Sequence, residues 1–398
     1  MKTSVPPRQF LLTLSIIVLA AGCSTLPVQN RPMAKYSEVA GYRFGNVAPG
    51  KKNSDNLLVV LTFSGGGTRA AAFAYGVLEK LRDTEIVWDG KRRRLLDEVD
   101  VISSVSGGSL PAAYYGLFGD RIFDDFSEKV LYRNIRKALL KRLFSPVNIP
   151  KLLSSKYGRT DLMADEFNRQ IFEKKTFGDL IQRNQRPFII INATDLSLGR
   201  RFSFTQQQFD LLDSDLSSYP VSHAVAASAA FPGLLTPMTL RNYLKDPATH
   251  TPAWIKEGLE SRDTDYSAYK AAVEQQTYIL AGRPYIHLVD GGVSDNLGLM
   301  PVIEFMDSTL KKGPIDPAIE KGASRKVVII VVNAQCTAVS QRDFRQRVLS
   351  LLPVLSAAST IPVGNFSDAE LGYLRTYVQS LEQQRNIRTK VGGLIGKE

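Results

Sequence analysis

A serine that directly follows a buried strand is the residue in this sequence best placed for covalent chemistry. Ser106 is the centre of residues 104–108, Ser-Val-Ser-Gly-Gly, which come at the end of a predicted strand, Val99–Val105. Such a pattern has the outline of a nucleophile elbow, a sharp turn from a strand into a helix that exposes the serine hydroxyl. The residues two positions before and after the serine must be small, and Ser104 and Gly108 both are.

The same turn allows another interpretation. A segment rich in serine can also be the N-cap of a helix that has no catalytic role. Three neighbouring hydroxyls lie off the centre of the motif and are rival nucleophiles: Ser103, Ser104 and Ser109. The interpretation of Ser106 as a nucleophile therefore depends on the groups that accompany it.

A glycine-rich turn earlier in the chain is suited to bind a developing negative charge. Residues 64–69, Ser-Gly-Gly-Gly-Thr-Arg, lie between the apolar run Leu57–Phe63 and a helical pattern over residues 70–81. Glycines there let backbone N–H groups point into a cavity at the positive end of a helix, which suits an anion.

The glycine turn also fits a dinucleotide-binding fingerprint with its alanine variant. Gly65-x-Gly67-x-x-Ala70 has the required spacing, and Glu85 follows at about 20 residues, where an acidic residue would bind a ribose. A Rossmann-type oxidoreductase is therefore an alternative from another class of enzyme.

An aspartate late in the chain is the candidate base. Asp290 is followed by Gly291 and Gly292 and comes directly after a predicted strand, Tyr285-Ile286-His287-Leu288-Val289. The two glycines make the carboxylate accessible, so that another residue can approach it closely. Taken alone this signal is weak, because Asp-Gly is common in turns.

The positions of the histidines favour a serine–aspartate dyad over a triad. The chain has 3 histidines and none precedes Ser106, which excludes the two triad orders with histidine before serine. The remaining familiar order needs a histidine after the aspartate, but His287 precedes Asp290, and residues three apart on a strand are about 10 Å apart. The rarer order Ser106-His287-Asp295 stays open. The other two histidines are interpreted as surface or structural residues: His223 and His250.

The three turns can form one site only if the strands that precede them end close together in one sheet. Apolar runs bounded by turn residues predict strands at residues 57–63, 99–105, 188–192, 285–289 and 326–333. Helical patterns separate them, the first over residues 70–81 and the next through Leu117. Strands that alternate with helices predict an α/β fold with a mostly parallel sheet covered on both faces.

Together the three turns resemble the motifs of the patatin-like phospholipase family. That family carries a Gly-Gly-Gly-x-Arg turn, a Gly-x-Ser-x-Gly elbow and an Asp-Gly-Gly or Asp-Gly-Ala turn, in this order. Residues 229–233, Ala-Ala-Phe-Pro-Gly, are similar to the family segment between elbow and aspartate, and the resemblance covers roughly residues 56–333. Two positions depart from it: Ser64 replaces the usual aspartate before the glycines, and Ser104 replaces the first glycine of the elbow.

The resemblance implies a lipid acyl hydrolase of the phospholipase A or lysophospholipase type on a three-layer α/β/α patatin-like fold. It implies that Ser106 forms an acyl-enzyme, that Asp290 is its base, and that membrane lipids are the substrate. The oxyanion hole is expected to be formed by Gly65, Gly66, Gly67 and Gly107. The motifs are supported by Arg69, Ser104, Gly108, Gly291 and Gly292. No metal, organic cofactor or nucleic acid is implied. A non-catalytic envelope lipoprotein on the same fold is the alternative.

Composition limits the class of protein. The chain has 398 residues, of which 44% are hydrophobic and 22% charged, as in globular proteins. Only 2 cysteines are present, which excludes a disulfide framework and a multi-cysteine metal site. No apolar run reaches the roughly 20 residues that a membrane-spanning helix needs. The net charge of +11 suggests attraction to anionic lipid head groups or to nucleic acid, and lipid is the more natural partner of a protein tethered to a membrane.

The amino terminus reads as a targeting signal. Residues 1–22 join a basic start to an apolar stretch that ends in small residues, which is typical of a secretory signal. Residues 19–23, Leu-Ala-Ala-Gly-Cys, resemble the lipobox of bacterial lipoproteins, in which Cys23 would be acylated. By the same resemblance, Ser24 favours the outer membrane of a bacterial cell envelope. An ordinary signal with an incidental cysteine is the alternative.

The sequence therefore divides into four parts. We expect a signal peptide over 1–22, a lipidated cysteine and tether over 23–55, a catalytic domain over 56–338 and a helical extension over 339–398. Within the domain, residues 129–142 hold six basic residues and no acidic one, interleaved with apolar residues. As an amphipathic helix this segment either faces a membrane or packs its apolar stripe on its own core.

Overall fold

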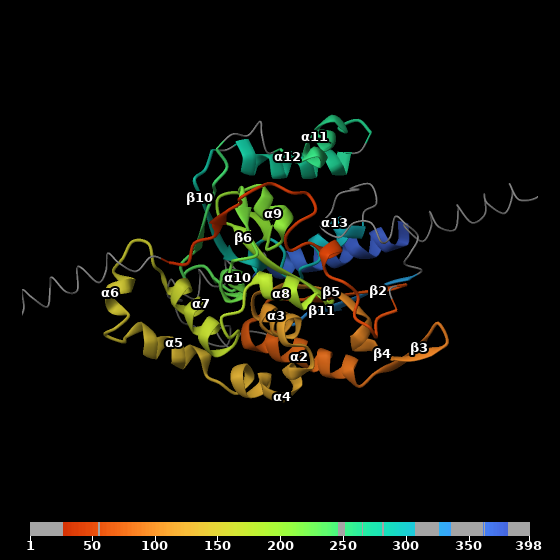
Figure 1. Ribbon diagram of the computed structural model, residues 1–398, viewed down its shortest axis with the longest axis horizontal. Coiled ribbons are helices and arrows are strands. Elements are labelled where there is room, and N and C mark those ends of the chain that lie inside the picture. The colour runs from red at the N-terminus through yellow and green to blue at the C-terminus, as the bar shows by residue number, and fades with distance from the viewer. Residues whose placement is uncertain are drawn as a thin grey trace, which may run out of the picture.

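A seven-stranded sheet forms the centre of the molecule (Figure 1). The computed structural model describes residues 27–54, 56–245, 251–264, 266–280, 282–306, 326–335, 361 and 363–380. The strands of the sheet are β2 (Leu57–Phe63), β5 (Val99–Val105), β6 (Phe188–Asp195), β7 (Arg200–Ser203), β9 (Met238–Arg241), β10 (Tyr285–Asp290) and β11 (Lys326–Val332). Their order is β11-β2-β5-β6-β10-β9, and β7 pairs with β6 off this path.

The sheet is parallel where the glycine turn and the elbow lie. Strands β11, β2, β5 and β6 run parallel to one another, whereas β7 and β10 pair antiparallel with β6, and β9 pairs antiparallel with β10. Every residue of β2, β5 and β6 is buried, because helices cover both faces. This burial explains why β2 is an almost continuous apolar run in the sequence, and both β2 and β5 have the predicted bounds.

Helices complete three layers. In the view of Figure 1, α2, α3 and α4 lie below the sheet, and α13 and the helix over residues 363–380 lie above it. The helices are α2 (Gly67–Arg82), α3 (Ser109–Phe118), α4 (Ile122–Phe126), α5 (Ile135–Leu143), α6 (Ile149–Leu152), α7 (Arg159–Gln170), α8 (Phe177–Arg183), α9 (Gln206–Asp210), α10 (Val221–Ser228), α11 (Ala253–Glu260), α12 (Tyr266–Leu280) and α13 (Met300–Met306). The predicted three-layer α/β/α fold is confirmed.

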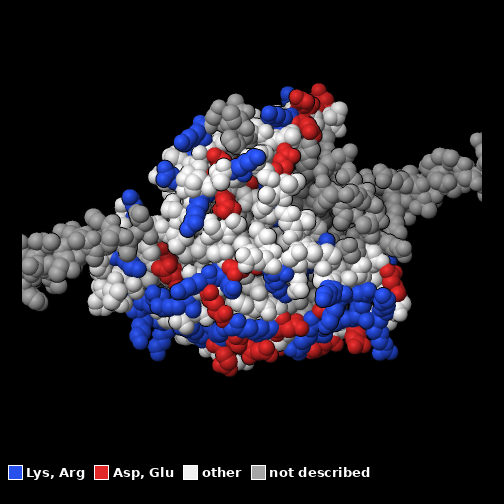
Figure 2. Space-filling view, viewed as in Figure 1, with Lys and Arg blue, Asp and Glu red and all other residues white. Residues whose placement is uncertain are grey.

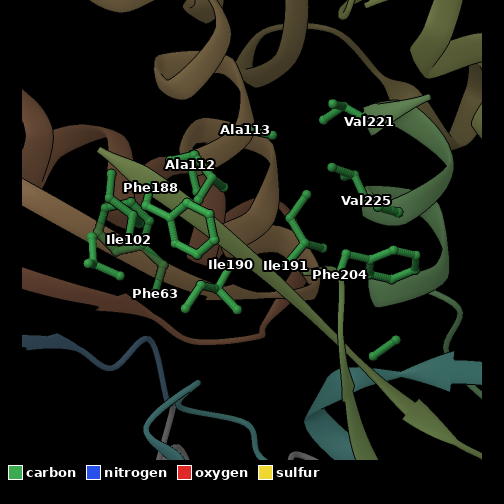
Figure 3. Close-up of a cluster of buried hydrophobic side chains, with 14 of the residues drawn as sticks. Phe63, Ile102, Ala112, Ala113, Phe188, Ile190, Ile191, Phe204, Val221 and Val225 are labelled. Atoms are coloured by element: carbon green, nitrogen blue, oxygen red, sulfur yellow. The ribbon is translucent and has the colours of Figure 1, made fainter. Parts of the chain in front are cut away.

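Small residues let the helices approach the sheet closely. Ala112 and Ala113 of α3 lie against the aromatic and branched side chains of β5 and β6, as Figure 3 shows around Ile102 and Phe188. All four of these side chains are fully buried. The core therefore lies directly behind the turns that end β2 and β5, and it fixes where those turns point.

The segment over residues 27–54, expected to be a tether, is instead packed on the domain. Tyr42 is 1% exposed, and its hydroxyl accepts a hydrogen bond from the N–H of Ile189 at 2.8 Å, in the middle of β6. Strand β1 (Arg31–Pro32) pairs with β8 (Ser214–Asp215). The prediction of a tether is wrong for these residues, because isolated aromatic residues in a polar segment give no periodic signal although they enter the core.

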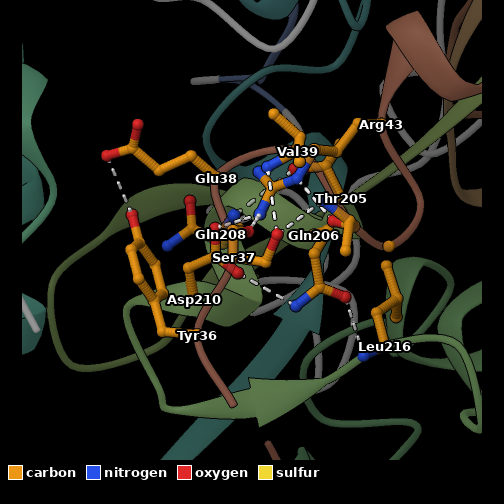
Figure 4. A network of polar contacts seen from close by, with 12 residues as sticks. Tyr36, Ser37, Glu38, Val39, Arg43, Thr205, Gln206, Gln208, Asp210 and Leu216 are labelled. Atoms are coloured by element: carbon orange, nitrogen blue, oxygen red, sulfur yellow. Dashed lines mark hydrogen bonds and ion pairs between the residues drawn. The ribbon is translucent and has the colours of Figure 1, made fainter.

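A polar network holds the same segment (Figure 4). Arg43 binds the carboxylate of Asp210 at 2.6 Å and donates to the backbone oxygen of Ser37 at 2.8 Å. Gln206 donates to Asp210 at 3.0 Å, and its side-chain oxygen accepts from the N–H of Leu216 at 3.1 Å. The segment is thus joined to α9 and the residues after it.

The basic segment over residues 129–142 packs part of its apolar stripe on the domain. Val130 is fully buried, and Ile135 and Leu139 pack against the core. This agrees with the second interpretation of the segment, although Leu140 is left exposed.

The predictions for the amino-terminal signal and for Cys23 fall on residues outside the described ranges. Of the predicted carboxyl-terminal extension, residues 363–380 are described, and they are helical. No helix in the described part of the chain has both the length and the apolar character to cross a membrane.

Candidate active site

The turn after β5 holds Ser106 in a strained backbone conformation. Residues Ser106–Gly108 form a single 3-10 turn between β5 and α3. Ser106 has a φ of 50°, in the left-handed region that residues other than glycine rarely adopt, and such strain is found where a side chain must be presented for function. The backbone is held by Ser228 of α10, whose hydroxyl accepts from the N–H of Ser106 at 2.7 Å and donates to the carbonyl of Asn192 at 2.6 Å.

Ser106 and Asp290 touch, although they lie 184 residues apart in the chain. The hydroxyl of Ser106 donates to Oδ2 of Asp290 at 2.9 Å. The other carboxylate oxygen accepts from the N–H of Gly292 at 2.8 Å, which fixes the carboxylate plane. The N–H of Asp290 donates to the carbonyl of Ala230, in the segment after α10. Both side chains are almost buried, since each residue is 7% exposed.

The strand that carries Asp290 runs against the direction of the parallel strands. It reaches the elbow because β6 continues beyond the end of β5. Asn192 of β6 is opposite Val105, the residue before Ser106, and the next residue, Ala193, is opposite Asp290. The added length of β6 therefore brings the ends of β5 and β10 to adjacent positions.

Burial changes the basicity of Asp290. It raises the pKa of the Asp290 carboxyl to about 6, and the hydrogen bonds from Gly292 and Ser106 limit the rise. The carboxylate is therefore ionised at neutral pH, yet it is a stronger base than an exposed aspartate. Both properties suit a group that takes a proton from a serine hydroxyl.

The rate of ester hydrolysis should consequently depend on the ionisation of Asp290. We expect kcat/KM to rise with pH to a plateau with a midpoint near 6, because protonated Asp290 cannot accept the proton of Ser106. Below the midpoint the rate should fall about tenfold for each pH unit. The measurement is kcat/KM for a soluble short-chain ester as a function of pH.

The control variant for this profile is His287→Gln. His287 lies on β10, is exposed, and its ring nitrogen Nδ1 contacts the hydroxyl of Thr239 at 3.0 Å. The replacement removes an imidazole close to the site without touching the dyad, so the midpoint should not move. A midpoint that moves in this variant, or a flat profile in the unmodified protein, would contradict the assignment to Asp290.

The glycine turn supplies backbone donors beside the serine. Gly66 and Gly67 have φ values of 137° and 63° and lie at the N-terminus of α2, where the first N–H groups have no partner within the helix. A Cβ atom on Gly107 would overlap the carbonyl oxygen of Gly67, so the elbow and the glycine turn are in direct contact. The glycine turn and the start of α2 therefore lie beside the elbow that carries Ser106.

Gly65 does not belong among these donors. Its N–H donates to the carbonyl oxygen of Asn296 at 3.0 Å, so it has no free hydrogen for an oxyanion. The expectation that all of Gly65, Gly66, Gly67 and Gly107 form the hole is wrong for Gly65, whose hydrogen bond instead fixes the turn.

The two residues that differ from the family motifs, Ser64 and Ser104, both form hydrogen bonds within the fold. Ser64 accepts a hydrogen bond from the N–H of Ala334 at 2.8 Å, just after β11. Ser104 donates from its hydroxyl to the carbonyl of Ile190 at 3.1 Å. Arg69 donates from Nε to the carbonyl of Ala334 at 3.0 Å, which is a structural contact.

Three motif glycines lie in close contact with neighbouring groups. A Cβ atom on Gly108 would lie 2.7 Å from the carbonyl oxygen of Ser64, and one on Gly291 would overlap the carbonyl of Asn192. A Cβ atom on Gly292 would lie 2.9 Å from Oδ1 of Asn296. These contacts explain why the turns need small residues on both sides of the dyad.

Sequence reasoning missed Asn296, which joins several parts of the site. Besides accepting from Gly65, it donates from its side chain to the hydroxyl of Ser367 at 3.4 Å. Ser367 belongs to the helix over residues 363–380. Asn296 follows Asp290 closely, but a single asparagine in a turn gives no sign that it contacts a segment so much later in the chain.

The helix over residues 363–380 also brings an acid into this region. Glu370 is 4% exposed and lies beside the fully buried Asp295. Burial together with the neighbouring Asp295 carboxyl raises the pKa of Glu370 well above its usual range. Leu374 of the same helix belongs to the hydrophobic core.

The histidines do not complete a triad in the described residues. Asp295 accepts from the N–H groups of Leu299 and Met300 at the start of α13 and not from His287, so the order Ser106-His287-Asp295 is wrong. His223 is 1% exposed, and burial lowers its pKa to about 4, which keeps it neutral. His250 lies outside the described ranges.

The dinucleotide fingerprint is not realised either. Glu85 lies on strand β3 (Glu85–Trp88), which pairs with β4 (Lys91–Arg94), and its carboxylate contacts Arg92 at 3.6 Å. Helix α2 separates Glu85 from the glycine turn, and a helix of 16 residues is about 24 Å long. Glu85 therefore cannot bind a ribose whose phosphates occupy that turn.

Comparison with known proteins identifies the family of the chain. A family model described as patatin-like phospholipase matches residues 61–303 of the chain. The matched region contains Ser106, Asp290 and the glycine turn. No curated protein matches the chain.

Proposed function

Because the chain belongs to the patatin-like phospholipase family, whose members hydrolyse lipid esters, we propose that Ser106 and Asp290 are its catalytic dyad. The observation that supports this assignment is the hydrogen bond of 2.9 Å from the Ser106 hydroxyl to the Asp290 carboxylate. The strained backbone of Ser106 and the raised pKa of Asp290 are consistent with it.

In the first half-reaction, Ser106 Oγ attacks the carbonyl carbon of the ester and its proton moves to Oδ2 of Asp290. The negative charge on the former carbonyl oxygen is stabilised by the N–H groups of Gly66, Gly67 and Gly107. When the tetrahedral intermediate collapses, Asp290 returns the proton to the leaving alcohol. The fatty acyl group remains as an ester on Ser106.

In the second half-reaction, a water molecule attacks the acyl carbon and gives one proton to Asp290. Collapse of this intermediate releases the fatty acid, and the proton on Asp290 returns to Ser106 Oγ. The carboxylate thus acts as base and then as acid in each half, so every proton is accounted for.

The proposed substrate is a membrane phospholipid or lysophospholipid. The support for this class is the family, together with the positive charge of the chain, which favours anionic head groups. The pattern around Cys23 further supports a place in a bacterial envelope, with an acyl anchor on that residue.

The experiment that tests the proposal follows both the nucleophile and the products. The protein should react with a fluorophosphonate probe at Ser106 and should release free fatty acid from phosphatidylglycerol, as detected by mass spectrometry. Ser106→Ala should abolish both signals.

Ser109→Ala is the matched control, because Ser109 lies one turn further on and contacts Ser228 at 3.2 Å rather than Asp290. It should keep both the probe reaction and the release of fatty acid. Probe labelling of Ser106→Ala would assign the nucleophile elsewhere. A correctly folded protein that releases no fatty acid would support the non-catalytic lipoprotein instead.

A further inference from the structure

The segment that includes α5 and α6 leaves an unusual number of large apolar side chains in water. Phe144, Val147 and Leu153 are 75%, 77% and 73% exposed. Six residues together define what we term the α5–α6 face: Tyr132, Leu140, Phe144, Val147, Ile149 and Leu153. Several large exposed apolar side chains within one short segment are a candidate interaction site.

The same segment carries charge of one sign. Residues 129–160 contain no aspartate or glutamate. Its basic residues are Lys129, Arg133, Arg136, Lys137, Lys141, Arg142, Lys151, Lys156 and Arg159. Figure 2 shows Lys and Arg gathered over α5, next to uncharged surface at α6.

Part of this charge is already neutralised within the domain. Glu166 of α7 is 5% exposed and binds Arg133 and Arg142 at 2.9 and 2.6 Å. In contrast, Lys137 and Lys141 are exposed and form no ion pair in the part of the chain that the structure describes. Exposed lysines beside exposed apolar side chains match the head groups and acyl chains at the surface of an anionic bilayer.

The beginning of the described chain lies at this face. Pro27 lines a groove of about 490 Å³ together with Leu143 of α5 and Leu152 of α6. Cys23 precedes Pro27 by four residues, which span at most about 14 Å even when fully extended. If Cys23 carries the proposed anchor, the point of attachment to the membrane is therefore held close to the α5–α6 face.

The loop after α10 links this groove to the active site. Thr236 lines the groove and accepts a hydrogen bond from the N–H of Thr160 of α7 at 3.3 Å. Six residues earlier, the carbonyl of Ala230 accepts from the N–H of Asp290. Leu234, between these two positions, is 65% exposed. One short loop therefore runs from the catalytic carboxylate to the groove.

We propose that the α5–α6 face is a docking surface for an anionic phospholipid bilayer. Its apolar side chains enter the boundary between head groups and acyl chains, while Lys137 and Lys141 contact lipid phosphates. Docking turns the loop around Leu234 towards the bilayer. This orientation bears on catalysis only under the proposed function, but docking itself requires no hydrolysis.

Hydrogen–deuterium exchange of the full chain tests the proposal. The protein carries the substitution Ser106→Ala so that it does not hydrolyse the lipids of the vesicles. The vesicles contain one part phosphatidylglycerol to two parts phosphatidylcholine. Peptides from residues 132–153 should exchange several-fold more slowly with these vesicles than without them. Peptides from β3 and β4 should not change. Vesicles of phosphatidylcholine alone should protect residues 132–153 less.

Two variants separate charge from apolar contact. Lys137→Glu with Lys141→Glu should raise the lipid concentration needed for half-maximal protection by about tenfold or more, since each basic residue near an anionic surface contributes substantially to binding. Phe144→Ser with Leu153→Ser should raise it as well. The matched controls lie on the hairpin formed by β3 and β4. Lys91→Glu with Arg92→Glu is the control for the lysine variant. Val87→Ser is the control for the apolar variant, because Val87 is 70% exposed. These should leave the protection unchanged.

Equal exchange with and without anionic vesicles would overturn the proposal, as would protection that survives both pairs of replacements on the α5–α6 face. Protection that appears without vesicles and grows with protein concentration would assign the face to a second copy of the chain instead. Activity on a soluble ester reports on the dyad separately, and the lysine variants should retain it. Docking and catalysis can thus fail independently.

Discussion

Replacing Asp290 with asparagine should lower kcat by at least about 10⁴-fold, the scale seen when a group that acts together with a serine nucleophile is removed. The amide cannot take the proton of Ser106, and no histidine in the described residues is positioned to replace it. The measurement is kcat on a soluble ester, with single-turnover kinetics to separate formation of the acyl-enzyme from its hydrolysis. Both steps should slow, because Asp290 activates the serine and then the water.

The same variant should not lose stability. The pKa of Asp290 is raised from 3.8 to about 6 in the folded protein, so its contribution to folding becomes less favourable as the pH rises through this range. Above pH 6 the buried carboxylate therefore costs stability, and the neutral amide removes that cost. The free energy of unfolding at pH 7 should be equal to or higher than that of the unmodified protein. A variant that loses activity because it unfolds would contradict this account.

Replacing Gly107 with alanine should damage both stability and catalysis. A Cβ atom at this position overlaps the carbonyl oxygen of Gly67, and neither backbone can move without displacing β5 or the start of α2. Overpacking of this kind costs about 1–3 kcal/mol. Displacement of the oxyanion donors should also lower kcat by at least about 100-fold. Urea unfolding and kcat measure the two effects.

Gly76→Ala is the control for this substitution. Gly76 lies within α2, and a Cβ atom there would have no neighbour within 4 Å. Alanine is favoured over glycine inside a helix by up to about 1 kcal/mol, so stability should rise slightly and kcat should stay unchanged. If Gly107→Ala behaved like Gly76→Ala, the contact between elbow and glycine turn would not be the constraint described here.

The sequence predicts well what local pattern determines. Strand β2 has the predicted bounds because a strand buried on both faces is nearly continuously apolar, and β5 has them because the glycine turn that follows it ends the strand. The predicted pair Ser106 and Asp290 is brought together because each follows a strand and is flanked by glycines that allow close approach. In these cases burial and close approach restrict residues that are neighbours in the chain, so the restriction is visible as a local sequence pattern.

Features set by distant contacts could not be predicted in this way. The direction of β10 depends on how the chain returns to the sheet, and nothing within Tyr285–Asp290 specifies it. Tyr42 enters the core as a single residue in a polar segment. The N–H of Gly65 is occupied by Asn296, a contact between two turns far apart in the sequence.

The contact between Asn296 and Ser367 has a consequence for biosynthesis. A ribosome completes the dyad and both glycine turns long before it reaches residues 363–380, so the nascent polypeptide already holds every reacting group. It still lacks the helix whose residues Ser367, Glu370 and Leu374 pack beside the turn that follows Asp290. The support of the aspartate turn by this helix is thus completed only after every reacting group has been synthesised.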